Sequence, residues 1–181
     1  TYYAFQGNCS YVLAQDENKD FTVIGHNEYC LESPLNTCTK AVTLRYKGHE
    51  VTLVHGLSFI IDEVTNSVLE EDTILGGNIA VKLVRGRFIL IEVEQVSLKI
   101  MYDEMTRGFA ISIPILVYHD RVGGLCGNCN LDGSDDFIDI TGEQHFVPIT
   151  FAETWKLEEV TCDDEVYTTR PPTMSTTHGP N

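Results

Sequence analysis

The chain has 181 residues, of which 43% are hydrophobic, and this length and composition suit one domain with a substantial core followed by a tail. Acidic residues outnumber basic ones by 27 to 12, which gives a net charge of −15, and the basic residues are scattered singly along the chain. We therefore expect no nucleic-acid partner, because phosphates would be repelled, and no membrane span, because no apolar run is long enough.

Hydrophobic and polar residues alternate with a period of two through most of the chain, which is typical of half-buried strands. About nine short strands at this spacing predict an all-β fold, an antiparallel sandwich or meander. Turn signals separate the strands at Lys47-Gly48, residues 76–78, Arg85-Gly86 and Arg107-Gly108. The predicted strands are Ser10–Ala14, Phe21–Ile24, Ala41–Tyr46, Glu50–Val54, Leu57–Val64, Ile79–Leu83, Phe88–Glu94, Val96–Tyr102 and Phe109–Ile115.

Residues 124–137 form a polar loop with the sequence Gly-Leu-Cys-Gly-Asn-Cys-Asn-Leu-Asp-Gly-Ser-Asp-Asp-Phe. Carboxylates this close together repel one another unless a cation lies between them, and Ca2+ accepts roughly six to eight oxygen ligands in a loose geometry. Asn, Asp and Gly are also the commonest turn formers, so a plain polar turn is the competing interpretation. We predict a calcium site whose ligands are Asn128, Asn130, Asp132, Asp135 and Asp136.

Three other interpretations of this loop fit the sequence less well. Asn128–Gly133 fit the opening of an EF-hand and Asp139 its twelfth position, but an EF-hand joins two helices, whereas this loop follows the strand-like run Phe109–Tyr118. Zinc binding at Cys126 and Cys129 would need a second Cys or His pair at ligand spacing, and the sequence has none. A thioredoxin-like redox motif would need a βαβ setting, and the helical periodicity is missing.

The end of the chain differs from the strand-rich part. Residues 151–157 predict one helical turn, with Trp155 packing back on the sheet. Residues 163–181 predict a disordered linker rich in Thr and Pro, which resembles an O-glycosylated stalk or a plain linker.

The cysteines and a sequon point to an extracellular protein. Six cysteines, an even number, suit a disulfide-bonded chain, and Asn8-Cys9-Ser10 predicts glycosylation of Asn8 in the secretory pathway. We therefore expect a secreted protein. The sequence shows no signal peptide, so we expect a mature chain or a piece of a longer precursor.

Several segments together resemble a von Willebrand factor type D domain: residues 2–13, residues 124–128, the step Asp135-Asp136-Phe137, and the closing residues 155–157 with Cys162. The resemblance covers residues 1–162 and is nearest to the D4-type domains of von Willebrand factor and gel-forming mucins, which have a similar Cys-Gly-x-Cys element. It implies packed antiparallel sheets, a structural calcium site on the five loop residues named above, and no catalysis. One further family ligand, an Asp, lies just before the segment aligned with Thr1, so we expect the N-terminal edge of the domain to be truncated.

The same resemblance implies a set of disulfides. Cys9 would bond Cys162, and Cys30 would bond Cys38 across a short loop. Cys126 has a family partner upstream of the first strand. Cys126 and Cys129 therefore either bond each other or hold upstream partners, and the sequence does not determine which.

Together these observations predict a disulfide-stapled β-sandwich that serves as a secreted structural and assembly module of a large mucin-like, matrix or clotting glycoprotein. Its partners would be protein modules of the same precursor or of like molecules, and a homo-oligomer is compatible with this role. One alternative is a type D module of a lipid-carrier or egg-yolk precursor. The other is a metal-dependent hydrolase using Asp135 and Asp136, but no recognisable catalytic set accompanies them, so we expect no enzyme activity.

Overall fold

The computed structural model describes residues 3–30, 33–67, 73–75, 78–158 and 162. The predicted linker at 163–181 and part of the predicted turn at 76–78 lie outside the described residues. No helix in the described part of the chain is long and apolar enough to cross a membrane.

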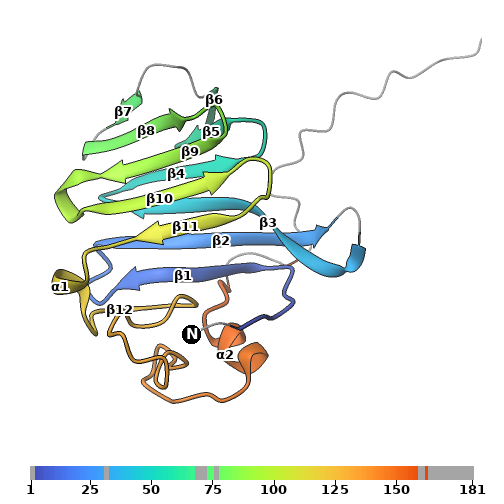
Figure 1. The fold of residues 1–181 in the computed structure, drawn as a ribbon, viewed down its shortest axis with the longest axis vertical. Coiled ribbons are helices and arrows are strands. Elements are labelled where there is room, and N and C mark those ends of the chain that lie inside the picture. Colours follow the sequence, from blue (N-terminus) through green and yellow to red (C-terminus); the bar gives the residue numbers. More distant parts are fainter. Residues whose placement is uncertain (1–2, 31–32, 68–72, 76–77, 159–161, 163–181) are drawn as a thin grey trace, which may run out of the picture.

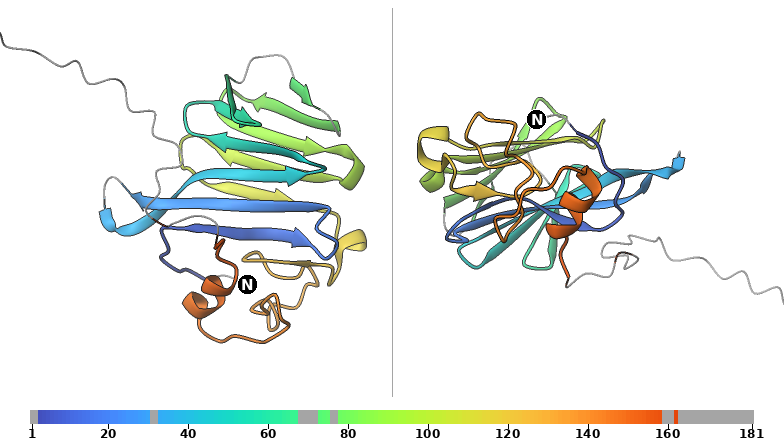
Figure 2. Two further views of the ribbon diagram at one scale, coloured as in Figure 1. Left: turned by 180° about the vertical axis from the view of Figure 1, so that it is seen from behind. Right: turned by 90° about the horizontal axis from the view of Figure 1, so that it is seen from below.

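Two antiparallel sheets pack face to face, so the predicted β-sandwich is confirmed (Figure 1). The first sheet contains β1 (Ser10–Asp16), β2 (Phe21–Cys30), β3 (Ser33–Tyr46), β4 (His49–Val54), β5 (Ser58–Ile61), β6 (Val64–Ser67) and β12 (Val122–Gly123), in the order β12-β1-β2-β3-β4-β5-β6. The second contains β7 (Thr73–Leu75), β8 (Ile79–Val84), β9 (Phe88–Val93), β10 (Leu98–Asp103) and β11 (Phe109–Ser112), in the order β11-β10-β9-β8-β7. The view from below shows the two layers edge-on (Figure 2).

The core lies between the sheets and follows the alternation of the sequence. In β10, Leu98, Ile100 and Tyr102 are fully buried, whereas Lys99 and Met101 between them are exposed. Each fully buried aliphatic side chain contributes about 1.5–3 kcal/mol relative to an exposed one, so the sum over both inner faces is the main favourable term for this fold. The second sheet thus packs against the first, and the polar loop follows β12 at the edge of the first sheet.

Within the described residues, the glycine turns at Lys47-Gly48, Arg85-Gly86 and Arg107-Gly108 were predicted correctly, and one hairpin without glycine was missed. Lys47 and Gly48 take φ values of 48° and 81° between β3 and β4, the left-handed geometry of a tight hairpin turn. Residues 57–64 were predicted as one strand, which is wrong. They are divided between β5 and β6 by Asp62 and Glu63, whose φ values of 45° and 72° give the same kind of turn without a glycine to mark it.

Other strand boundaries were also wrong. Strand β2 continues to Cys30, beyond the predicted Phe21–Ile24, and β3 begins at Ser33, before the predicted Ala41–Tyr46. Val96 was predicted to start a strand, but it ends a 3-10 helix (Glu94–Val96), and the left-handed Ser97 (φ 49°) redirects the chain into β10. The strand predicted at Phe109–Ile115 ends at Ser112, because Pro114 precedes a short helix, α1 (Ile115–Tyr118). The strand-like run to Tyr118 is therefore not a strand, and the polar loop follows α1 and β12. Strands β7 and β12 were not predicted.

The closing segment, residues 148–157, packs against β1 at one end of the sandwich (Figure 1). The predicted helix at 151–157 begins earlier, as α2 (Pro148–Thr154), with Pro148 in the first turn where no backbone N–H is needed. Trp155 is only 7% exposed, and its carbonyl accepts a 2.8 Å hydrogen bond from the Val12 amide, so its packing against the sheet is confirmed. Leu157 then donates to the Ser10 carbonyl at 2.9 Å.

Both disulfides implied by the family resemblance are present. Cys9 bonds Cys162 across a sequence separation of 153, and Cys30 bonds Cys38 across a separation of 8. The first joins the start of β1 to the chain beyond the closing segment, and the second closes the β2–β3 hairpin. Cys126 and Cys129 are free thiols in this structure, so the disulfide between them is not formed.

Candidate metal centre

The polar loop is attached to β1 by its backbone. The amide of Leu125 donates to the Val12 carbonyl at 3.0 Å, and the amide of Cys126 donates to the Leu13 carbonyl at 2.9 Å. Gly124 has a φ of 132°, and a Cβ atom there would lie 2.6 Å from the Leu13 carbonyl oxygen. Only glycine fits this close approach, which fixes where the loop begins.

An aromatic cluster holds the other end of the loop. The ring of Phe137 stacks on Phe151 of α2 at 4.8 Å between centroids, and Tyr3 meets Phe137 edge-on, also at 4.8 Å. The hydroxyl of Tyr3 donates to the Leu125 carbonyl. Burial raises the pKa of Tyr3 above its usual range, so the phenol remains a hydrogen-bond donor at neutral pH. The loop is therefore anchored to the core at both ends.

Between these anchors the loop turns back on itself at every second residue. The side-chain oxygen of Asn128 accepts from the Asn130 amide at 3.4 Å, and that of Asn130 accepts from the Asp132 amide at 2.7 Å. Asp132 accepts from both the amide and the hydroxyl of Ser134, at 2.9 and 2.7 Å, and these hydrogen bonds lower its pKa. Leu131 is left-handed, with a φ of 69°. The alternating residues thus have a local structural role in addition to any role as ligands.

The two adjacent carboxylates face the start of the loop. Asn130 donates its side-chain amide to Asp135 Oδ2 at 2.9 Å, whereas Asp135 Oδ1 is buried and has no hydrogen-bond partner in the structure. The Asp136 carboxylate lies against Gly127, where a Cβ atom would come within 2.1 Å of Asp136 Oδ1. A buried carboxylate oxygen without a partner is costly, and a bound cation would remove that cost.

A metal bound here would need the amide oxygens of the loop. Within the described residues, no group of three or more His, Cys, Asp or Glu side chains is arranged to hold a metal ion. The calcium ligands predicted from the sequence combine two Asn with three Asp, a hard oxygen set that fits Ca2+, and this site remains a prediction.

A cavity of about 540 Å³ lies beside the loop. It is bounded by the β1–β2 turn, by the chain around β12, and by the loop with its following turn, and Trp155 lines it as well. Six carboxylates and two basic side chains line it, a balance of −4: Asp16, Glu17, Asp120, Asp135, Asp136 and Asp139 against Lys19 and Arg121.

Asp139 has a different role from the loop residues, and this role was not predicted. Its carboxylate lies 2.8 Å from His145 Nε2 and accepts hydrogen bonds from Thr141 and from the Glu143 amide. These hydrogen bonds hold its pKa well below its usual range. Asp139 therefore holds the turn at 139–143 together. The helices on either side of the loop are the four-residue α1 and the seven-residue α2, which begins only at Pro148. An EF-hand loop would join two helices directly, and this loop does not.

Both free thiols have a raised pKa. The residue Cys126 as a whole is exposed, but the protein packed around its sulfur, together with the Asp136 carboxylate, raises the pKa of the thiol to about 11. Burial also raises the pKa of Cys129. Because the thiolate is the reactive form, these values oppose a redox role for this Cys-x-x-Cys pair. Upstream partners for both cysteines remain a prediction.

The predicted glycosylation site, Asn8, is half-buried just before β1. The hydroxyl of Ser10 in the same sequon lies 2.7 Å from His26 Nδ1. Glycosylation of Asn8 remains a prediction.

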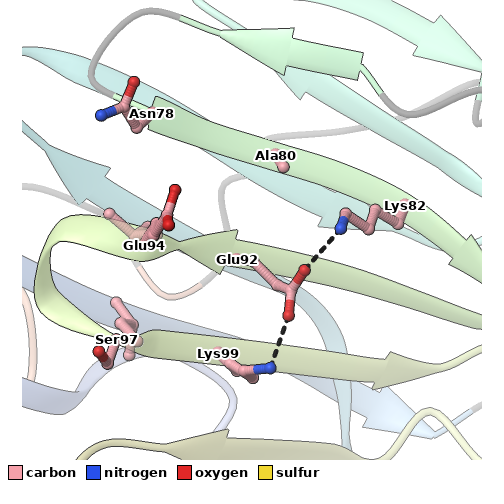
Figure 3. Close-up of a pocket in the computed structure, with 9 residues that line it drawn as sticks. Asn78, Ala80, Lys82, Glu92, Glu94, Ser97 and Lys99 are labelled. Carbon is pink, nitrogen blue, oxygen red and sulfur yellow. Dashed lines mark ion pairs between the residues drawn. The ribbon is translucent and has the colours of Figure 1, made fainter.

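A second cavity, of about 480 Å³, lies on the outer face of the second sheet (Figure 3). Glu92 of β9 pairs with Lys82 of β8 at 2.8 Å and with Lys99 of β10 at 2.6 Å. Hydrogen bonds from these two lysines lower the pKa of Glu92. The three charges thus link neighbouring strands across the sheet surface.

The von Willebrand factor type D domain model matches residues 1–143 of the chain. SCO-spondin of Gallus gallus is 28% identical over 155 residues, covering 86% of this chain and 3% of the relative. Von Willebrand factor of Bos taurus is 28% identical over 173 residues, covering 90% of this chain and 17% of the relative. Mucin-5B of Homo sapiens is 27% identical over 161 residues, with coverages of 86% and 3%. The chain thus spans a small part of each of these relatives.

Proposed function

Because the chain belongs to the von Willebrand factor type D domain family, we propose that it is a calcium-stabilised, secreted assembly module of a large extracellular glycoprotein. Two disulfides support an oxidising, extracellular setting. The relatives, which include a mucin and von Willebrand factor, are much longer than the matched region. A module of this kind acts through contacts with other protein modules.

The observation that carries the calcium part of the proposal is the unpartnered Asp135 Oδ1. This buried oxygen lies in the same loop as the Asp136 carboxylate and the amide oxygens of Asn128 and Asn130. Calcium between them would give the oxygen a partner and reduce the repulsion between the two carboxylates. It would also keep the loop in a single conformation and so present a defined surface to a neighbouring module.

The acidic loop is proposed to have no turnover of its own. The carboxylates that a hydrolase would use as acid and base are the ones best suited to bind the cation, and Asp139 is engaged by its own turn. The raised thiol pKa values of Cys126 and Cys129 do not favour nucleophilic catalysis either.

The proposal is tested by measuring binding of this chain to the adjoining modules of its precursor, in calcium and in EGTA. We expect binding that weakens when calcium is removed, and the same weakening in Asp135→Asn with calcium present. Glu63→Gln, an exposed acid on the β5–β6 turn, is the matched control and should bind as the parent does. Binding that is equal with and without calcium would contradict the calcium part, and turnover in a hydrolase screen that is lost in Asp135→Asn would favour an enzyme.

A further inference from the structure

Exposed apolar side chains are concentrated in the stretch of chain that runs from the polar loop to α2. Eleven large hydrophobic side chains are exposed in the described part of the chain, and five of them fall between residues 131 and 149. Phe146 is 87% exposed and Ile140 63%. We call these five residues the loop-end patch: Leu131, Ile140, Phe146, Val147 and Ile149. Single exposed apolar residues are normal, but their concentration in the segment that forms one end of the sandwich (Figure 1) is typical of an interaction surface.

The loop-end patch meets the acidic cavity at Ile140, which is exposed and also lines the cavity. Of the two basic side chains in the cavity lining, Arg121 is already paired with Glu17, with 2.7 Å between Nε and Oε1. The carboxylates of the lining exceed its basic groups by four, and a bound Ca2+ would leave a balance of −2. The cavity therefore attracts cationic groups with or without calcium.

We propose that the acidic cavity and the loop-end patch together dock a protein surface that carries lysine or arginine beside apolar side chains. This inference rests on the proposed assembly function and names the surface and the chemistry of its partner. The cavity supplies the charge complementarity, and the patch supplies apolar area with one large aromatic side chain, Phe146, of the type that dominates binding energy at interfaces.

The occupant is a different protein surface and not a second copy of this chain. Each copy carries a net charge of −15, and its basic residues are scattered singly along the sequence. Two copies of the same strongly acidic chain therefore repel each other, which favours a partner of opposite charge. A neighbouring module whose surface carries both basic and apolar side chains would complement the acidic cavity and the loop-end patch.

Trp155 provides the signal for a test, because it is the only tryptophan in the chain and lines the cavity. The probe is a synthetic peptide of alternating lysine and leucine, titrated while Trp155 fluorescence is recorded. We expect saturable binding that weakens as salt is raised, since about 0.1 M salt screens charges beyond roughly 10 Å. A glutamate–leucine peptide of the same pattern should not bind, and a lysine–serine peptide should bind much more weakly.

Substitutions at two exposed positions distinguish binding at this surface from nonspecific attraction of the probe to an acidic protein. Each substitution has a matched control. Asp120→Asn removes a carboxylate of the cavity wall outside the calcium set, and Asn tolerates the φ of 54° at this position. Its control is Glu63→Gln. Phe146→Ser is compared with Leu116→Ser, because Leu116 on α1 is 97% exposed. We expect each patch or cavity variant to weaken probe binding about fivefold or more, and the controls by less than about twofold.

The same four variants are then titrated with the adjoining modules. Calcium-dependent module binding that is unaffected by Asp120→Asn and Phe146→Ser would overturn this inference and leave the proposed function intact. If the probe binds as expected but no adjoining module binds, the proposed function is overturned and the docking surface remains supported. Equal effects in variants and controls, or a dimer of this chain in sedimentation that Phe146→Ser abolishes, would overturn the docking proposal.

Discussion

The disulfide between Cys9 and Cys162 should stabilise the domain much more than the one between Cys30 and Cys38. The sequence separations are 153 and 8. In the chain-entropy model the longer closed loop is worth about 5 kcal/mol at 25 °C and the shorter about 2.5 kcal/mol. We therefore compare Cys9→Ala/Cys162→Ala with Cys30→Ala/Cys38→Ala, and we expect the first pair to lose about 2.5 kcal/mol more of the free energy of unfolding.

The structure explains why the long loop can be closed without disturbing the fold. Leu157 donates to the Ser10 carbonyl and Val12 donates to the Trp155 carbonyl, so the two ends of the domain already lie side by side. The assay is urea unfolding followed by Trp155 fluorescence, with the slope of unfolding free energy against urea checked for each variant. Equal losses in the two variants, or a larger loss for Cys30→Ala/Cys38→Ala, would refute the reasoning.

Two further predictions concern the loop and its turn. Gly127→Ala should destabilise the protein by more than about 1 kcal/mol and weaken calcium binding, because a Cβ atom would lie 2.1 Å from Asp136 Oδ1. Gly142→Ala is its control in urea unfolding and calcium titration, since Gly142 has a similar φ of 89° with open space around it, so equal effects would contradict the contact. Asp139 has a folded-state pKa below its unfolded value of about 3.9, so the stability it contributes is present above that pH and is lost as pH falls through the folded pKa. Urea unfolding at about pH 4 and about pH 2 should thus show a smaller loss of stability in Asp139→Asn than in the parent, and equal losses would contradict this assignment.

Periodicity was enough to predict the sheets, because the inner and outer faces of each strand differ so strongly. In β10 the alternation of buried Ile100 with exposed Met101 is visible in the sequence. The hairpin at Lys47-Gly48 was equally visible, since glycine marks a positive φ. The turn at Asp62-Glu63 was not visible in the sequence. The pairing of β5 with β6 gives both residues a left-handed conformation, although neither is a glycine.

The candidate site was predicted only in part, for a different reason. The sequence predicted the oxygen-bearing residues of the loop, but not what supports them. The loop docks on β1 through the backbone amides of Leu125 and Cys126, and Gly124 alone did not reveal which strand the loop contacts. The pairing of Asp139 with His145 depends on a turn that brings the two side chains together. The stacking of Phe137 on Phe151 likewise depends on where α2 lies.

The most direct test of the central claim is the free energy of unfolding of the parent chain in calcium and in EGTA. Ligand binding to the native state alone adds RT ln(1 + [L]/Kd), which is about 2.7 kcal/mol at roughly 100 times Kd. We predict a gain of this size for the parent, little gain for Asp135→Asn, and the full gain for the control Glu63→Gln. An unchanged free energy of unfolding in the parent, at calcium concentrations up to the millimolar range, would contradict a calcium-stabilised module.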